Sequence, residues 1–69
     1  MTTIKLEEAM KIYNELEQNT TMKTKTAGRT IKIKECEENG WKYTFFFDND
    51  ILKKIEAYNR RELIENYVR

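Results

Sequence analysis

The pair Asn39-Gly40 most constrains the fold, because it separates residues 29–38 from residues 41–48, two runs in which apolar and polar side chains alternate. Such alternation is typical of half-buried strands, and an Asn-Gly pair between two of them predicts a β-hairpin. A two-residue loop would set Ile33 opposite Phe46 and split the apolar side chains between two faces. We therefore expect a three-residue loop over residues 38–40, with Gly40 in the left-handed conformation of a bulge.

The expected register gathers the large apolar side chains of both strands on one inner face. It pairs Ile33 with Phe45 and Ile31 with Phe47. The inner face would hold Ile31, Ile33, Trp41, Tyr43, Phe45 and Phe47. The lysines of the hairpin and Phe46 would then point outward.

An amphipathic helix is predicted for residues 6–17, where the apolar side chains recur at helical spacing. They form the stripe Leu6, Ala9, Met10, Tyr13 and Leu16. Ile4 falls off this stripe, which indicates that the first residues form an extended segment.

The threonine-rich residues 19–29 favour a third, outer strand that turns back at Ala27-Gly28. This turn would pair Thr26 with Arg29. A mobile loop is the alternative, because the segment has one large apolar side chain.

Two short helices are predicted after the hairpin. Residues 48–50, Asp-Asn-Asp, have the chemistry of a helix N-cap, and the apolar side chains of residues 50–58 follow helical spacing. The next apolar side chains would project from the opposite side of an unbroken helix. Asn59 and Glu62 have the spacing of a capping box, so a second helix is expected over residues 60–68.

The predicted fold class is therefore α+β in a single small domain of residues 1–69. An N-terminal helix and one or two C-terminal helices would pack on one face of an antiparallel hairpin of two or three strands.

Composition argues against an enzyme. The chain has no histidine, and its two glycines are too far apart for a phosphate-binding loop, so we expect no catalytic residue, cofactor, metal or small-molecule substrate. The single cysteine, Cys36, falls among polar strand positions. This position predicts a reduced surface thiol, which is typical of a cytoplasmic protein. The net charge of +1 and the lack of a long apolar run predict no membrane partner.

The favoured function is a non-enzymatic binding module that acts through protein contacts, as a homodimer or on another protein. The C-terminal segment holds more apolar side chains than one small core needs, although packing on that core is an equally simple explanation. The predicted interface residues are Tyr58, Arg60, Arg61, Leu63, Ile64, Tyr67 and Val68. Small size and abundant Lys, Ile, Asn and Glu suit a regulator or inhibitor from an AT-rich bacterial or phage genome.

The alternative function is nucleic-acid binding by the outer face of the hairpin. Residues 18–34 contain five basic and no acidic side chains, and lysines around an exposed aromatic ring can hold phosphates and a stacked base. The candidate residues are Lys23, Lys25, Arg29, Lys32, Lys34, Lys42 and Phe46. The simpler interpretation is that these lysines are solvated and protect a sheet edge from aggregation.

Overall fold

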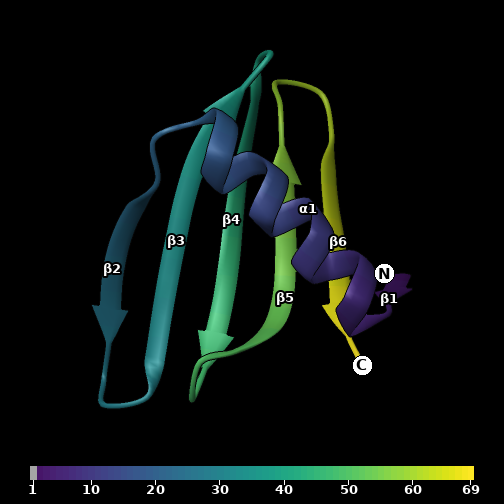
Figure 1. The fold of residues 1–69 in the computed structure, drawn as a ribbon. Coiled ribbons are helices and arrows are strands. Elements are labelled where there is room, and N and C mark those ends of the chain that lie inside the picture. Colours follow the sequence, from purple (N-terminus) through teal and green to yellow (C-terminus); the bar gives the residue numbers. More distant parts are fainter. Residues whose placement is uncertain (1) are drawn as a thin grey trace.

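The computed structural model describes residues 2–69, which form one six-stranded sheet with a single helix against it (Figure 1). The strands lie in the order β1-β6-β5-β4-β3-β2. Consecutive strands from β2 to β6 are antiparallel, and β1 pairs with β6 in parallel. The elements are β1 (Thr2–Ile4), α1 (Leu6–Asn19), β2 (Lys23–Ala27), β3 (Ile31–Glu38), β4 (Trp41–Asp48), β5 (Ile51–Tyr58) and β6 (Leu63–Val68).

The predicted N-terminal helix is confirmed as α1, which carries the chain diagonally over the sheet from one edge to the other (Figure 1). Ala9, Tyr13 and Leu16 are buried, as the helical spacing predicted, while Leu6 at the first turn stays 40% exposed. The extended lead-in is also confirmed, because Ile4 ends β1.

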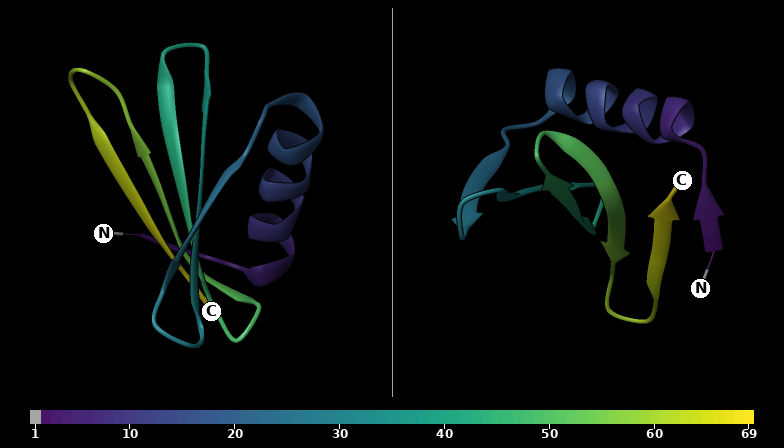
Figure 2. Two further views of the ribbon diagram at one scale, coloured as in Figure 1. Left: turned by 90° about the vertical axis from the view of Figure 1, so that its left-hand side faces the viewer. Right: turned by 90° about the horizontal axis from the view of Figure 1, so that it is seen from below.

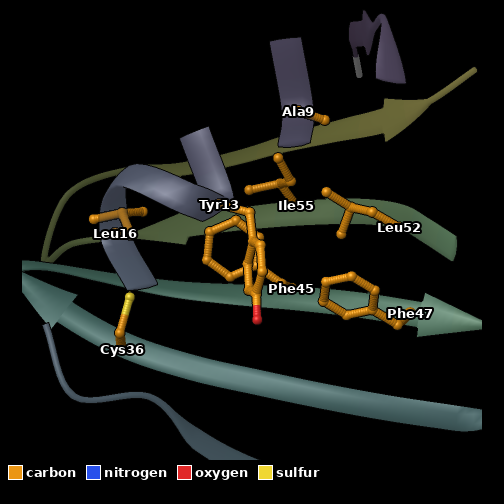
Figure 3. Packing of buried hydrophobic residues seen from close by; sticks show 8 residues of the cluster. All are labelled: Ala9, Tyr13, Leu16, Cys36, Phe45, Phe47, Leu52 and Ile55. Carbon is orange, nitrogen blue, oxygen red and sulfur yellow. The ribbon is translucent and has the colours of Figure 1, made fainter. Parts of the chain in front are cut away.

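The core lies between α1 and the central strands (Figure 3). The ring of Tyr13 packs edge-on against Phe45 and Phe47, with ring centroids 5.2 and 5.1 Å apart and interplanar angles of 74° and 73°. Edge-to-face packing of this kind stabilises an aromatic pair beyond the area it buries. β5 contributes Leu52 and Ile55 to the same cluster.

The hairpin β3–β4 is present, but the expected three-residue loop is wrong. Glu38 pairs with Trp41, so the loop is the two residues Asn39 and Gly40, whose φ angles of 53° and 81° are those of a type I′ turn. A type I′ turn has a twist that matches the right-handed twist of the strands it joins. This local preference outweighs the burial that would come from gathering all apolar side chains on one face.

The shorter loop reverses the predicted faces of β3. Ile31 and Ile33 point away from α1, whereas Lys34 pairs with Phe45 and lies on the helix side. Cys36 also turns inward and is 5% exposed, so its interpretation as a surface thiol is wrong.

A third strand at the hairpin is confirmed as β2, although its register differs from the expected one. Ala27 pairs with Ile31, which leaves residues 28–30 as the loop instead of a tight turn that pairs Thr26 with Arg29. Gly28 adopts a φ of 83° in this loop, a conformation that glycine enters without steric cost.

The predicted C-terminal helices are wrong, and with them the predicted fold class, because residues 51–58 and 63–68 form β5 and β6. The cause in β5 is a bulge: Phe46 pairs with Lys54 and Phe47 with Leu52, which leaves Lys53 as an extra residue. Leu52 and Ile55 therefore both point inward although they are three positions apart. A bulged strand reproduces the apolar spacing of a helix.

The polar residues assigned to helix caps form turns instead. Asn49 and Asp50 have φ angles of 50° and 65° and make the two-residue connection between β4 and β5. The Asn59 side-chain oxygen accepts hydrogen bonds from the backbone N–H groups of Arg61 (2.8 Å) and Glu62 (2.9 Å). The same acceptor chemistry caps helices and closes Asx turns, so it does not distinguish between them.

Replacing Gly40 by alanine should lower the free energy of unfolding by about 1 kcal/mol, because alanine is strained at this positive φ. No atom lies within 4 Å of the added Cβ, so the effect would be conformational and not steric. Urea unfolding of Gly40→Ala beside Lys42→Ala, a change at a neighbouring exposed position, measures it. Equal stability of the two variants would contradict the type I′ turn.

Candidate protein-binding surface

The helix covers one face of the sheet and leaves the other uncovered (Figure 2). We call the uncovered side the open face and the other side the helix face. Side chains alternate along a strand, so the register of neighbouring strands assigns each residue to a face. The buried cluster marks the helix face, and the residues between its members point to the open face.

A row of four side chains crosses the centre of the open face. Ile33 pairs with Phe46, Phe46 with Lys54, and Lys54 with Tyr67. The Lys54 ammonium lies 4.5 Å from the centroid of the Phe46 ring and 5.6 Å from that of Tyr67. Glu56 holds the same ammonium at 3.8 Å. Aromatic rings around a fixed cation are the kind of group that contributes most to protein interfaces.

Further apolar side chains flank this row at both ends of the open face. Tyr58 and Leu63 pair across β5 and β6 and are 56% and 54% exposed. At the other end, Ile31 and Ile51 lie on either side of Asp48, and Ile51 is 48% exposed. The open face thus has apolar side chains at its centre and at both ends, with the polar row Glu35, Thr44, Glu56 and Glu65 between the centre and the Tyr58–Leu63 pair.

Charges of both signs lie among these apolar side chains. Lys25 and Glu35 form an ion pair across β2 and β3, with Nζ 3.5 Å from Oε1. The register places on this face Lys23, Lys25, Lys42 and Lys54 together with Glu35, Glu37, Asp48, Glu56 and Glu65. A surface with charges of both signs can complement the mixed charges of another protein. A polyanion such as nucleic acid binds best to a uniformly positive surface.

The structure divides the predicted interface residues among three places. Tyr58, Leu63 and Tyr67 come together on the open face, where all three are exposed. Arg60 and Arg61 lie in the turn between β5 and β6. The remaining two residues, Ile64 and Val68, point to the helix face, and Val68 packs against the core.

The candidate nucleic-acid residues are also divided. Lys23, Lys25, Lys42 and Phe46 share the open face, while Lys32 and Lys34 lie on the helix face and Arg29 lies in the loop after β2. The Lys54 ammonium already lies over the ring of Phe46, on which a nucleic-acid base would have to stack. The single basic face that the sequence predicted is therefore not formed.

Lys34 closes one side of the core instead of joining a surface patch. Its Nζ donates a hydrogen bond of 2.8 Å to the Tyr13 hydroxyl and lies 5.3 and 5.5 Å from the ring centroids of Tyr13 and Phe47. Burial is the main cause that raises the pKa of Tyr13 above its ordinary 10.0. The hydrogen bond with Tyr13 is the main cause that raises the pKa of Lys34 above 10.5.

Sequence reasoning missed Lys54 as a member of the surface and assigned Ile31 and Ile33 to the core. A signal for the correct arrangement was present. The two-residue loop divides the apolar side chains of β3 and β4 between two faces, and this division indicates a sheet with apolar groups on both sides.

Within the part of the chain that the structure describes, no three His, Cys, Asp or Glu side chains gather as metal ligands would. Among residues 2–69, α1 is the single helix, and it is neither long nor apolar enough to cross a membrane.

Comparison of the chain with protein-family models, with curated proteins and with solved structures gives no match in any of the three.

The unfolding free energy should fall with rising alkaline pH through the Tyr13–Lys34 pair. Both groups have a raised pKa in the folded state, so the stability they contribute is complete below the ordinary values of 10.0 and 10.5 and is lost as the pH passes the folded values. Urea unfolding at neutral pH and above pH 10 measures the loss, which should be smaller in Tyr13→Phe.

Tyrosinate absorbance provides an independent check, because the raised pKa of Tyr13 should give the folded protein an ionisation step above pH 10.0 that is absent from Tyr13→Phe. Loss of a step at or below pH 10.0 in Tyr13→Phe would contradict the assignment.

Proposed function

We propose that this chain is a small non-enzymatic module that binds protein through the open face, and that two copies associate through the same face. The proposal rests on the Phe46–Lys54–Tyr67 row and on the exposed Tyr58–Leu63 pair of the same face, which lies beyond the Glu56–Glu65 pair. Aromatic side chains with a partly shielded cation supply large contact areas at low entropic cost. A soluble, cytoplasmic regulator or inhibitor of phage type is the cellular role that we infer for such a module.

A protein partner is favoured over nucleic acid by the arrangement of charge. Glu56 and Glu65 pair with each other beside the aromatic row and would repel a phosphate backbone that approaches it. Lys32 and Lys34 lie on the far side of the sheet from Lys42, so the three cannot contact one strand of nucleic acid laid across the open face.

The matched leucines Leu63 and Leu6 offer a direct test of self-association. Leu63 is 54% exposed on the open face and Leu6 is 40% exposed on α1, so Leu→Ser is tolerable for the fold at both positions. Light-scattering mass at increasing protein concentration should rise from the 8.4 kDa monomer toward a dimer. Leu63→Ser should raise the concentration needed by about 10- to 100-fold, because both copies of the dimer lose a half-exposed leucine whose burial contributes about 0.8–1.5 kcal/mol, while Leu6→Ser should behave as wild type.

A constant monomer mass would contradict self-association and would leave a different protein as the partner. Photo-crosslinking in cells that express the chain would then test whether a different protein binds the open face. A benzophenone amino acid replaces Tyr67 in one variant and Leu6 in the other. A discrete adduct from Tyr67 alone would support the open face. Adducts that are the same from both positions would contradict it.

A fluorescence-anisotropy titration with random single-stranded and duplex oligonucleotides tests the alternative. We expect no saturable binding. Binding that weakens steeply with salt and disappears in a Lys23→Glu/Lys25→Glu variant would support nucleic-acid binding instead.

A further inference from the structure

The diagonal path of α1 leaves part of the helix face uncovered. Six strands about 4.8 Å apart span about 24 Å, whereas one helix with its side chains is about 10 Å across. α1 runs from the β1–β6 side toward the turn between β3 and β4 (Figure 1). The ends of β4, β5 and β6 that lie beside this turn therefore extend past the helix.

Two adjoining hollows occupy this uncovered corner. The first has a volume of about 190 Å³ and is lined chiefly by Ile12, Trp41, Tyr43, Ala57 and Ile64. The second has a volume of about 230 Å³ and shares Ile12 and Tyr43 with the first. Together they form one groove beside α1, apolar in the first hollow and mixed apolar and acidic in the second, in which Ile12 and Ile64 remain 37% and 36% exposed.

The charges that line this groove are acidic. Glu15 and Glu38 border the second hollow, and neither belongs to an ion pair among residues 2–69. Glu8 lies one helical turn before Ile12 and so shares its side of α1. Arg60 and Arg61 line a third hollow, which shares only Trp41 with the first and no residue with the second.

This distribution argues against a second copy of the chain as the occupant. Two α1 helices packed antiparallel about Ile12 would bring Glu8 of one copy to Glu15 of the other, and like charges at such contacts are destabilising. A partner with basic side chains next to an apolar stripe would instead find opposite charges at the second hollow, which Glu15 and Glu38 line, and apolar side chains at the first.

We propose that the groove between α1 and the ends of β4–β6 binds a basic amphipathic helix of a different protein. One side of this helix would place apolar side chains against Ile12, Trp41 and Ile64, and its Lys or Arg side chains would reach Glu15 and Glu38. A bound helix would lie beside α1 as a second helix on the same face, which is the usual way for a wide sheet to bury its apolar surface. The open face takes no part in this contact.

The test uses two synthetic, fluorescein-labelled amphipathic helices that differ only in charge, one built from leucine and lysine and the other with glutamate at every lysine position. Fluorescence anisotropy should show that the lysine peptide binds the wild-type chain at least about 10-fold more tightly, as two exposed ion pairs predict. Ile12→Ser/Ile64→Ser should weaken this binding, with circular dichroism as the check that the variant is folded.

Charge reversal provides the sharper arm. Glu15→Lys/Glu38→Lys should make the chain prefer the glutamate peptide, whereas Glu37→Lys/Glu65→Lys, an equal change of charge on the open face, should leave the preference for lysine intact. Equal loss of preference in both double variants would show general electrostatic attraction and would overturn the proposal.

Two further outcomes separate this proposal from self-association through the open face. Leu63→Ser should not alter peptide binding. A concentration-dependent dimer that Ile12→Ser abolishes would identify a second copy as the occupant of the groove and would overturn the assignment to a basic helix.

Discussion

The pairing of Glu38 with Trp41 determines the rest of this structure, because it decides which side chains of β3 and β4 lie beneath the helix. A side chain in a strand changes face when the register shifts by one residue. The two-residue turn therefore places Cys36 and Lys34 on the helix face with Phe45, and it sends Ile33 to the open face with Phe46. The open face gains Ile31 and Ile33 from this offset, and the core gains Cys36.

The same offset gives the sheet apolar side chains on both faces. On the helix face, the aromatic rings of β4 enclose Tyr13, and Lys34 reaches over the edge of this cluster to the tyrosine hydroxyl. On the open face, Lys54 has a similar position between Phe46 and Tyr67. In both places the lysine ammonium lies within about 6 Å of two aromatic ring centroids, a cation–π arrangement that suits a chain too small to bury every ring.

The two proposed surfaces differ in chemistry because they lie on opposite sides of β4–β6. The open face mixes lysines and glutamates around its aromatic row, so it can complement a protein with charges of both signs, including a second copy. The groove beside α1 combines an apolar floor with Glu15 and Glu38, so it selects a basic partner. Ile64 and Leu63 are neighbours in the sequence but serve different surfaces, because adjacent residues of a strand point in opposite directions.

Local sequence patterns determined α1 and the existence of β2, β3 and β4. Helical spacing identified Ala9, Tyr13 and Leu16, and the Asn-Gly pair located the hairpin, although the loop lengths predicted there and after β2 are wrong. The pattern also indicated surplus apolar side chains in the C-terminal segment, although it assigned them to a helix and counted Val68, which packs against the core, among them. Cap residues such as Asn59 marked chain reversals correctly but could not show whether a helix or a strand follows, because the same hydrogen bonds serve both.

Only the tertiary structure decided the register of β3–β4 and the strand conformation of β5 and β6. The bulge at Lys53 gives β5 the apolar spacing of a helix, and a stretch of eight residues is too short for periodicity alone to separate the two. Pairing with β4 on one side and β6 on the other supplies the hydrogen bonds that make the strand the stable state. β4 and β6 are joined to β5 by turns of only two and four residues, yet the apolar spacing within residues 51–58 does not show that these neighbours pair with it as strands. The composition of both binding surfaces is therefore fixed by inter-strand pairing and not by the spacing within any one segment.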